Sequence, residues 1–177
     1  MRITTVPRSA AAGFVALVAV LACCPPRVDA KAAYAGKAEM VRRSDAVAVV
    51  EVLRVEKAEV KGKHWTYSQR AVAKVSKTLK GVLPAAGKQV ALFGGEDFIC
   101  AQCNFQPGKY VVFLQQDGGL WAGSNWHLSV RPVATDKDGK EWVDWYVKDN
   151  SIELKSTPLT EVLADVQKAI ADAARAE

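Results

Sequence analysis

Hydrophobic and polar residues alternate, or gather in short apolar runs, along most of the chain after residue 44, which is typical of β-strands. The clearest run is AVAVVEVLRV at 46–55, which is nearly continuous in Val and Leu and therefore predicts a central strand. Turn sequences separate the runs, and Asp117-Gly118-Gly119 favours a hairpin. Further strands are expected from residue 65 to Leu79-Lys80-Gly81, at 89–93 before Gly94-Gly95, at 109–114, at 120–133 with an interruption near 123–125, and at 141–147.

Two segments have helical periodicity instead. Residues 32–43 are rich in good helix formers and place Tyr34, Ala38 and Val41 on one face. At the other end, Thr157 can cap a helix over 158–175, with Pro158 at its first position and apolar residues along one face. Five or six strands joined by short turns, with a helix before and after them, predict an all-β antiparallel barrel or sandwich with flanking helices.

The chain begins with the features of an export signal. Residues 1–9 are polar with Arg2 and Arg8 as their charged side chains, and residues 10–24 are uninterrupted apolar and small residues. That run is shorter than the roughly 20 residues that a membrane-spanning helix needs. We expect 1–30 to be a signal peptide that is removed, which leaves one domain at 31–177 in a secreted or periplasmic protein.

The position of the cut has three interpretations, because signal peptidase favours small residues before the bond. A cut after Ala30 satisfies this preference, and so does a cut between Ala22 and Cys23. The same Ala22-Cys23 bond lies in a bacterial lipobox, Val20-Leu21-Ala22-Cys23, whose processing leaves an acylated cysteine. Contact with a membrane, as an anchored lipoprotein, is expected only if Cys23 is lipidated.

The charge of the chain disfavours nucleic-acid binding. The 24 basic and 19 acidic side chains give a net charge of +5 at pH 7. Removal of Arg2 and Arg8 with the signal lowers this by two, to about +3, and the remaining basic residues form no dense block. No nucleic-acid partner is therefore expected.

Recognisable catalytic sets are missing from the sequence. The two histidines, His64 and His127, occur without the motifs of a metalloprotease, a serine hydrolase or a phosphate-binding loop. We expect both to be surface or satisfied strand residues, and we expect no enzyme activity, metal or cofactor.

The pair Cys100 and Cys103 forms the most specific local pattern, C-x-x-C. In thioredoxin-like proteins this motif opens a helix, whereas here turn residues and a strand follow it. In an exported protein the pair predicts a structural disulfide, and a thiol-disulfide redox enzyme is the alternative.

Five tryptophans are many for this length, and aromatic residues on strands usually pack in the core or against a neighbouring strand. Trp142 and Trp145 are three residues apart and would face opposite sides of a regular strand, so one of them is expected to be exposed. With Tyr146 they are candidates for exposed aromatic contacts, to a protein or, as a further alternative, to a carbohydrate.

Four segments together carry a family resemblance. They are Cys23-Cys24-Pro25-Pro26, then Ser44-Asp45-Ala46-Val47 entering the Val-rich strand, then Leu79-Lys80-Gly81, and last CNFQPGKYVVFL at 103–114. In this order they resemble the tissue-inhibitor-of-metalloproteinase-like (netrin-like) family.

The resemblance implies a five-stranded OB-type barrel. It also implies that an N-terminal cysteine, which Cys23 would supply with Cys24 beside it, presents its amino group and carbonyl to the catalytic zinc of a metalloproteinase. We therefore predict an exported, non-catalytic binding module whose partner is another protein, with a metalloproteinase as the partner that the resemblance implies.

Overall fold

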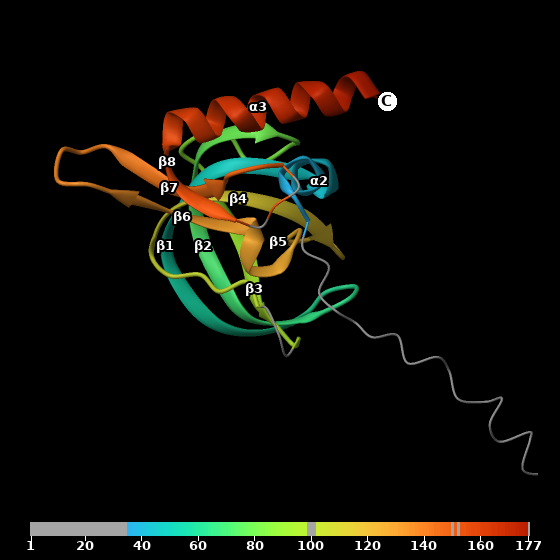
Figure 1. Ribbon diagram of the computed structural model, residues 1–177. Helices are drawn as coiled ribbons and strands as arrows, with labels where there is room; N and C mark the ends of the chain where they lie inside the picture. Colours follow the sequence, from blue (N-terminus) through green and yellow to red (C-terminus); the bar gives the residue numbers. More distant parts are fainter. Residues whose placement is uncertain (1–34, 99–101, 150, 152, 177) are drawn as a thin grey trace, which may run out of the picture. The chain divides into compact units, whose positions relative to one another are not determined.

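The computed structural model describes residues 35–98, 102–149, 151 and 153–176 of the 177-residue chain (Figure 1). The expected export segment 1–30, with Cys23 and Cys24, lies outside these residues, and so does Cys100. The signal peptide, its cleavage and the acylation of Cys23 therefore stay predictions.

Five strands close into a barrel in the order β1-β2-β3-β5-β4, because β4 also pairs with β1. Neighbouring strands are antiparallel except β3 and β5, which run parallel. The expected OB-type barrel with flanking helices is thereby confirmed. The strands are β1 (Ala46–Lys61), β2 (Thr66–Lys80), β3 (Gln89–Glu96), β4 (Gly108–Asp117) and β5 (Leu120–Gly123).

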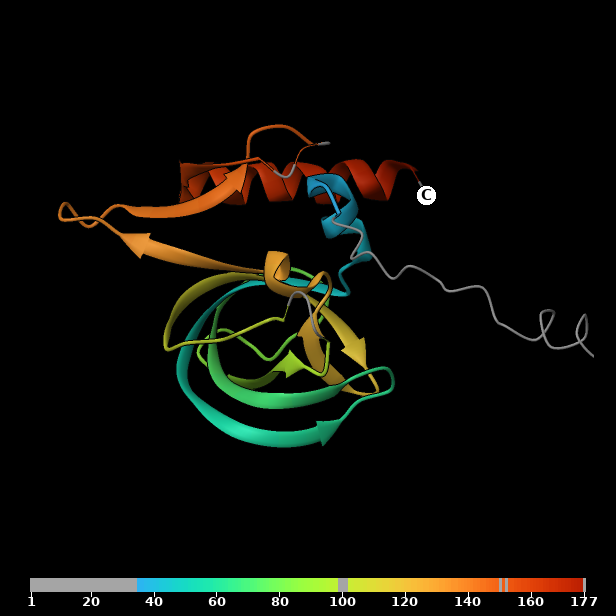
Figure 2. The same ribbon diagram turned by 60° about the horizontal axis from the view of Figure 1, so that its bottom comes forward.

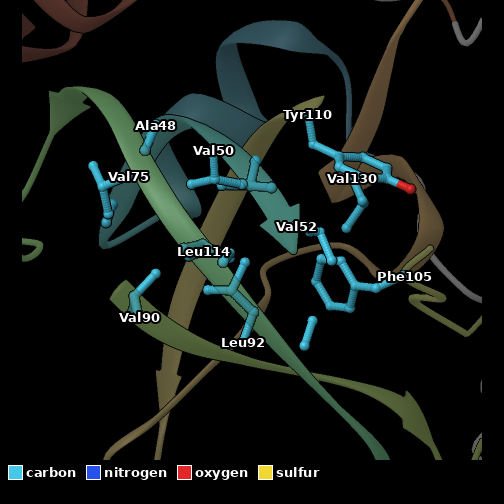
Figure 3. Packing of buried hydrophobic residues seen from close by; sticks show 14 of the residues in the cluster. Ala48, Val50, Val52, Val75, Val90, Leu92, Phe105, Tyr110, Leu114 and Val130 are labelled. Atoms are coloured by element: carbon cyan, nitrogen blue, oxygen red, sulfur yellow. The ribbon is translucent and has the colours of Figure 1, made fainter. Parts of the chain in front are cut away.

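The Val-rich run is nearly continuous because β1 is buried on both faces at its start. Along β1 the even-numbered residues 46–52 pack into the cluster that fills the barrel, whereas Val47 and Val49 pack into a second cluster outside it. Figure 3 shows side chains of the first cluster converging from the strands around them. Its larger members include Val50, Val75, Leu92, Phe105, Tyr110 and Leu114.

The second cluster lies between the barrel and a layer made of a small antiparallel sheet and two helices (Figure 2). Strand β6 links the two layers, since it pairs with β4 in the barrel and with β7 in the small sheet. The elements of this layer are α2 (Lys37–Arg43), β6 (Val130–Thr135), β7 (Glu141–Tyr146), β8 (Leu154–Pro158) and α3 (Leu159–Ala176).

One carboxylate ties three of these elements together. Asp165 on α3 accepts a hydrogen bond of 2.8 Å from the indole Nε1 of Trp145 on β7 and forms an ion pair of 2.9 Å with Lys37 on α2. The Trp145 ring in turn stacks on Phe113 of the barrel, with ring centres 5.8 Å apart. The apolar face of α3 is therefore held in one register against the sheet.

Two expectations about the elements were wrong. Strand β8 was not predicted, and Pro158 ends this strand instead of opening the helix, which begins at Leu159. The pair Gly94-Gly95 does not stop β3, which continues to Glu96. The interruption expected near 123–125 is present, since β5 ends at Gly123 and the 3₁₀ helix η1 (Trp126–Ser129) separates it from β6.

Candidate binding pocket at one end of the barrel

The buried carboxylate of Asp117 joins the β4–β5 turn to the β1–β2 turn. It accepts hydrogen bonds from the backbone N–H groups of His64 (2.9 Å) and Trp65 (3.3 Å) and from the Tyr67 hydroxyl (2.8 Å), and it contacts His64 Nδ1 at 2.8 Å. Gly62 permits this approach, since a Cβ there would lie 2.1 Å from Asp117 Oδ2. The β1–β2 turn is thus fixed over this end of the barrel.

Burial works to raise the pKa of Asp117, but the hydrogen bonds from Tyr67, His64 and Trp65 outweigh it and hold that pKa below its usual range. The same contact acts oppositely on the phenol. Burial raises the pKa of Tyr67 far above its usual range, and the hydrogen bond to the Asp117 carboxylate raises it further. The pair is therefore a neutral phenol donating to an ionised carboxylate, which is a strong, charge-assisted hydrogen bond.

A small, partly enclosed pocket of about 60 Å³ adjoins this junction. Its walls come from the start of β2, the ends of β3, β4 and β5, and η1. These segments meet because β3 pairs with β2 and β5, and β5 pairs with β4. The volume has room for a few water molecules or for the end of one side chain. The lining residues include Trp65, Tyr67, Glu96, Gly123, Ser124 and Trp126.

Aromatic rings form the rim of this pocket. Phe98 stacks on Trp126 with ring centres 5.4 Å apart and an angle of 17° between the planes, and Trp65 meets Phe98 edge to face at 5.5 Å. All three residues are partly exposed. We call Trp65, Phe98 and Trp126 the aromatic rim.

The backbone at Trp126 is in an unfavourable conformation. Its φ is +47°, in the left-handed region that a bulky side chain rarely adopts and that costs on the order of 1–3 kcal/mol. The preceding residue, Asn125, is fixed by a backbone hydrogen bond to the Ser129 hydroxyl. Such strain persists where the surroundings impose it, and it is common where a side chain must be presented to a ligand.

Glu96 lines the pocket and has 3% of its surface exposed. One carboxylate oxygen accepts a hydrogen bond of 2.7 Å from the backbone N–H of Cys103. Burial raises the pKa of Glu96, and the hydrogen bonds from the backbone N–H groups of Cys103 and of Glu96 itself oppose the shift only partly. No described cationic side chain forms an ion pair with the charged form.

Sequence reasoning did not single out the rim or Glu96. Residue 96 has the parity of Val90 and Leu92, which point into the barrel, so a β3 extended through Gly94-Gly95 would have placed a carboxylate among the interior positions. Gly94 is needed for another reason, namely that a Cβ there would lie 2.2 Å from the Cys103 carbonyl oxygen. The close approach of two chains explains the glycine and allows the strand to continue.

The expectation of exposed aromatic contacts on β7 was wrong for two of its three residues. Trp145 and Tyr146 are 2% and 4% exposed, because Trp145 lies between Phe113 and α3 while the Tyr146 hydroxyl donates to the Ala35 carbonyl. Both faces of β7 are therefore buried at this point. Trp142 is partly buried, and its Nε1 donates to Asp136 across the β6–β7 hairpin.

The Cys103 thiol is free and fully buried. Burial raises the pKa of this thiol well above its usual range, and the nearby Glu96 carboxylate raises it further. The thiolate form is therefore strongly disfavoured, whereas thiol-disulfide exchange needs a thiolate. Its expected partner, Cys100, lies outside the described residues.

The two histidines occupy different environments. His64 is exposed and bonded to Asp117, in keeping with the expected role as a satisfied surface residue. Burial lowers the pKa of His127, and the positive charge of nearby Arg131 lowers it further. Within the described ranges, no three His, Cys, Asp or Glu side chains are grouped so that they could hold a metal ion.

A larger hollow of about 740 Å³ lies between the outside of the barrel, the β6–β7 hairpin and the start of α3. Basic and acidic groups are mixed in it, and the ion pair between Lys109 and Glu141 (2.6 Å) forms part of its wall. The hollow therefore presents no single charge to a ligand.

A scan of protein-family models found none that matches this chain, and a search of curated proteins found no match either. None of the helices in the described part of the chain is both long enough and apolar enough to cross a membrane.

Proposed function

We propose that this protein is a non-catalytic binding module that recognises another protein through the aromatic rim and the pocket beneath it. The observation that carries the proposal is the arrangement of the three partly exposed rings around a pocket with a buried carboxylate. Partly exposed aromatic clusters around a pocket are typical anchor points of protein interfaces. The pocket is too small for a sugar ring, which favours a protein side chain over a carbohydrate.

The chemistry of the polar groups supports binding over catalysis. Asp117 uses its carboxylate to hold the β1–β2 turn, and the Cys103 thiol is buried with a raised pKa. A general base or nucleophile would need access to substrate and a pKa near the working pH. Thiol-disulfide exchange is therefore the weaker candidate for this chain.

A relationship to the netrin-like family remains part of the proposal. The OB-type strand order is the feature of the described residues that supports it. The inhibitory chemistry that the resemblance implies would need Cys23 as a free N-terminus, and export would deliver the protein to a secreted or periplasmic partner. Intact-mass and N-terminal analysis of the mature protein, with a metalloproteinase inhibition assay, tests this part separately.

The binding proposal can be tested by site-specific photo-crosslinking in the native host. A benzophenone amino acid replaces Phe98 on the rim or, as a control, Val82, which is 88% exposed in the β2–β3 connection. We expect a discrete protein adduct from position 98 that is absent from position 82 and is lost when Trp126→Ala is added. The same adducts from both positions, or none from position 98, would contradict the proposal.

A further inference from the structure

The aromatic pocket has the chemistry of a receptor for one positive charge. The Glu96 carboxylate lines it, is buried, and accepts hydrogen bonds from backbone N–H groups, those of Cys103 and of Glu96 itself. A buried carboxylate is costly unless it is protonated or paired with a cation. The pocket thus contains an acidic group whose natural complement is missing from the described residues.

The rings around the carboxylate add a second attraction for a cation. Trp65, Tyr67 and Trp126 line the pocket, and Phe98 contacts both indoles, stacked on Trp126 and edge to face with Trp65. The faces of aromatic rings attract ammonium and guanidinium groups, most strongly for tryptophan and in sites shielded from water. A purely apolar ligand would satisfy the rings but would leave Glu96 unpaired.

Two further carboxylates lie close to the pocket. Asp97 follows Glu96 and accepts a hydrogen bond from the Thr66 N–H, and Asp117 lies on the opposite turn. Of the basic residues on the β1–β2 turn, His64 is bonded to Asp117, and Lys63 is exposed to solvent. The carboxylates of Glu96, Asp97 and Asp117 thus lie at or near the pocket of a chain whose net charge is positive.

We infer that the pocket binds the ammonium group of a lysine side chain of the protein partner, with Glu96 as the counter-ion and Trp65 and Trp126 as the walls. The inference rests on the proposed binding function and names the group that the rim receives. The volume of about 60 Å³ suits an ammonium group with its last methylene groups. The flat rim outside the pocket would contact the residues that flank this lysine.

The test uses the purified protein and two probes whose ends are capped and uncharged, Nα-acetyl-lysine methylamide and its norleucine counterpart. The indole N–H signals of Trp65 and Trp126 report on the pocket in NMR titrations, and those of Trp121 and Trp142 serve as internal controls. We expect saturable shifts of the first two signals with the lysine probe and affinity at least about 10-fold weaker for norleucine. Equal responses to both probes, or no response to either, would overturn the inference.

Variants locate the site. Glu96→Gln should weaken lysine binding at least about 10-fold, whereas Glu161→Gln, which removes an exposed carboxylate at the start of α3, should leave it unchanged. Trp126→Leu removes one wall without touching Glu96 and should also weaken binding, so the inference stays testable if Glu96→Gln fails to fold. Lysine affinity that survives both substitutions would overturn it.

The same variants separate this inference from the function on which it rests. If the crosslinked adduct from position 98 persists in Glu96→Gln while the lysine probe does not bind the wild type, the protein is a binding module and the cation pocket is wrong. If no adduct forms from position 98 while the lysine probe binds as expected, the pocket stands and the protein-binding function fails.

Discussion

The hydroxyl of Tyr67 donates a hydrogen bond of 2.8 Å to Oδ2 of Asp117, and both side chains are 1% exposed. The contact connects the start of β2 to the β4–β5 turn, across the end of the barrel where the pocket lies. Because Tyr67 is also a wall of the pocket, the stability of the barrel end and the geometry of the binding site depend on the same pair.

Removing this hydrogen bond should be costly. Tyr67→Phe leaves a buried, ionised carboxylate without one of its donors, and we expect the free energy of unfolding to fall by about 2–3 kcal/mol. Tyr110→Phe is a matched control, because the Tyr110 hydroxyl makes only neutral backbone contacts with Gln106 and should cost about 1 kcal/mol. Urea unfolding measures both, and equal losses would show that the charge of Asp117 adds nothing.

Gly62 should be intolerant of any side chain. In Gly62→Ala the new Cβ would displace the Asp117 carboxylate, which would loosen the β1–β2 turn, and we expect a loss of about 2 kcal/mol or more. Gly139→Ala is the control for adding a methyl group without a clash, since a Cβ there would meet no atom within 4 Å. Its expected cost, roughly 1–2 kcal/mol, comes from the φ of +78° alone. A smaller loss at position 62 than at position 139 would contradict the role of Gly62.

The raised pKa of Glu96 predicts a particular pH dependence. Because the folded pKa lies above the unfolded value near 4.5, the stability linked to this group is complete below that value and is lost as the pH rises through the folded pKa. Glu96→Gln lacks this loss, so its stability relative to wild type should increase from about pH 4 to pH 8. Urea unfolding across this range checks the trend, and a constant difference would mean that Glu96 has an ordinary pKa.

The lower pKa of Asp117 has the opposite sign and should be visible at acid pH. Its contribution is present above the unfolded value near 3.8 and is lost as the pH falls through the lower folded pKa. In Asp117→Asn the free energy of unfolding should therefore fall less between neutral and acid pH than in wild type, although the variant is less stable at pH 7. Acid titration followed by near-ultraviolet circular dichroism measures this difference.

The sequence predicted the barrel because its strongest signals are local. The Val-rich run of β1 and the glycine turns depend on neighbouring residues only, and β1 and the Asp117-Gly118-Gly119 turn lie where they were expected. Strand β8 was missed because Leu154–Pro158 shows no alternation of apolar and polar residues and ends in proline. It is a strand because β7 supplies its hydrogen bonds, which is a tertiary effect.

The pocket could not be found from sequence for the same reason. Trp65, Glu96 and Trp126 are 30 or more residues apart, and they meet only through the pairing of β3 with β2 and β5. Trp145 and Tyr146 were misread as exposed candidates because strand parity says which face a residue is on, but not whether a second layer covers that face.

The free thiol of Cys103 gives a last prediction that bears on the expected disulfide. Because the thiol is fully buried with a raised pKa, we expect iodoacetamide to label it slowly in the folded protein and rapidly in denaturant, without any reductant. Peptide mass spectrometry distinguishes Cys103 from Cys100. If Cys103 can be labelled in denaturant only after reduction, the cysteine is part of a disulfide, and a peptide in which it is joined to Cys100 would confirm the structural-disulfide interpretation of the C-x-x-C pair. If it is labelled rapidly in the folded state, the thiol is accessible and the redox alternative regains support.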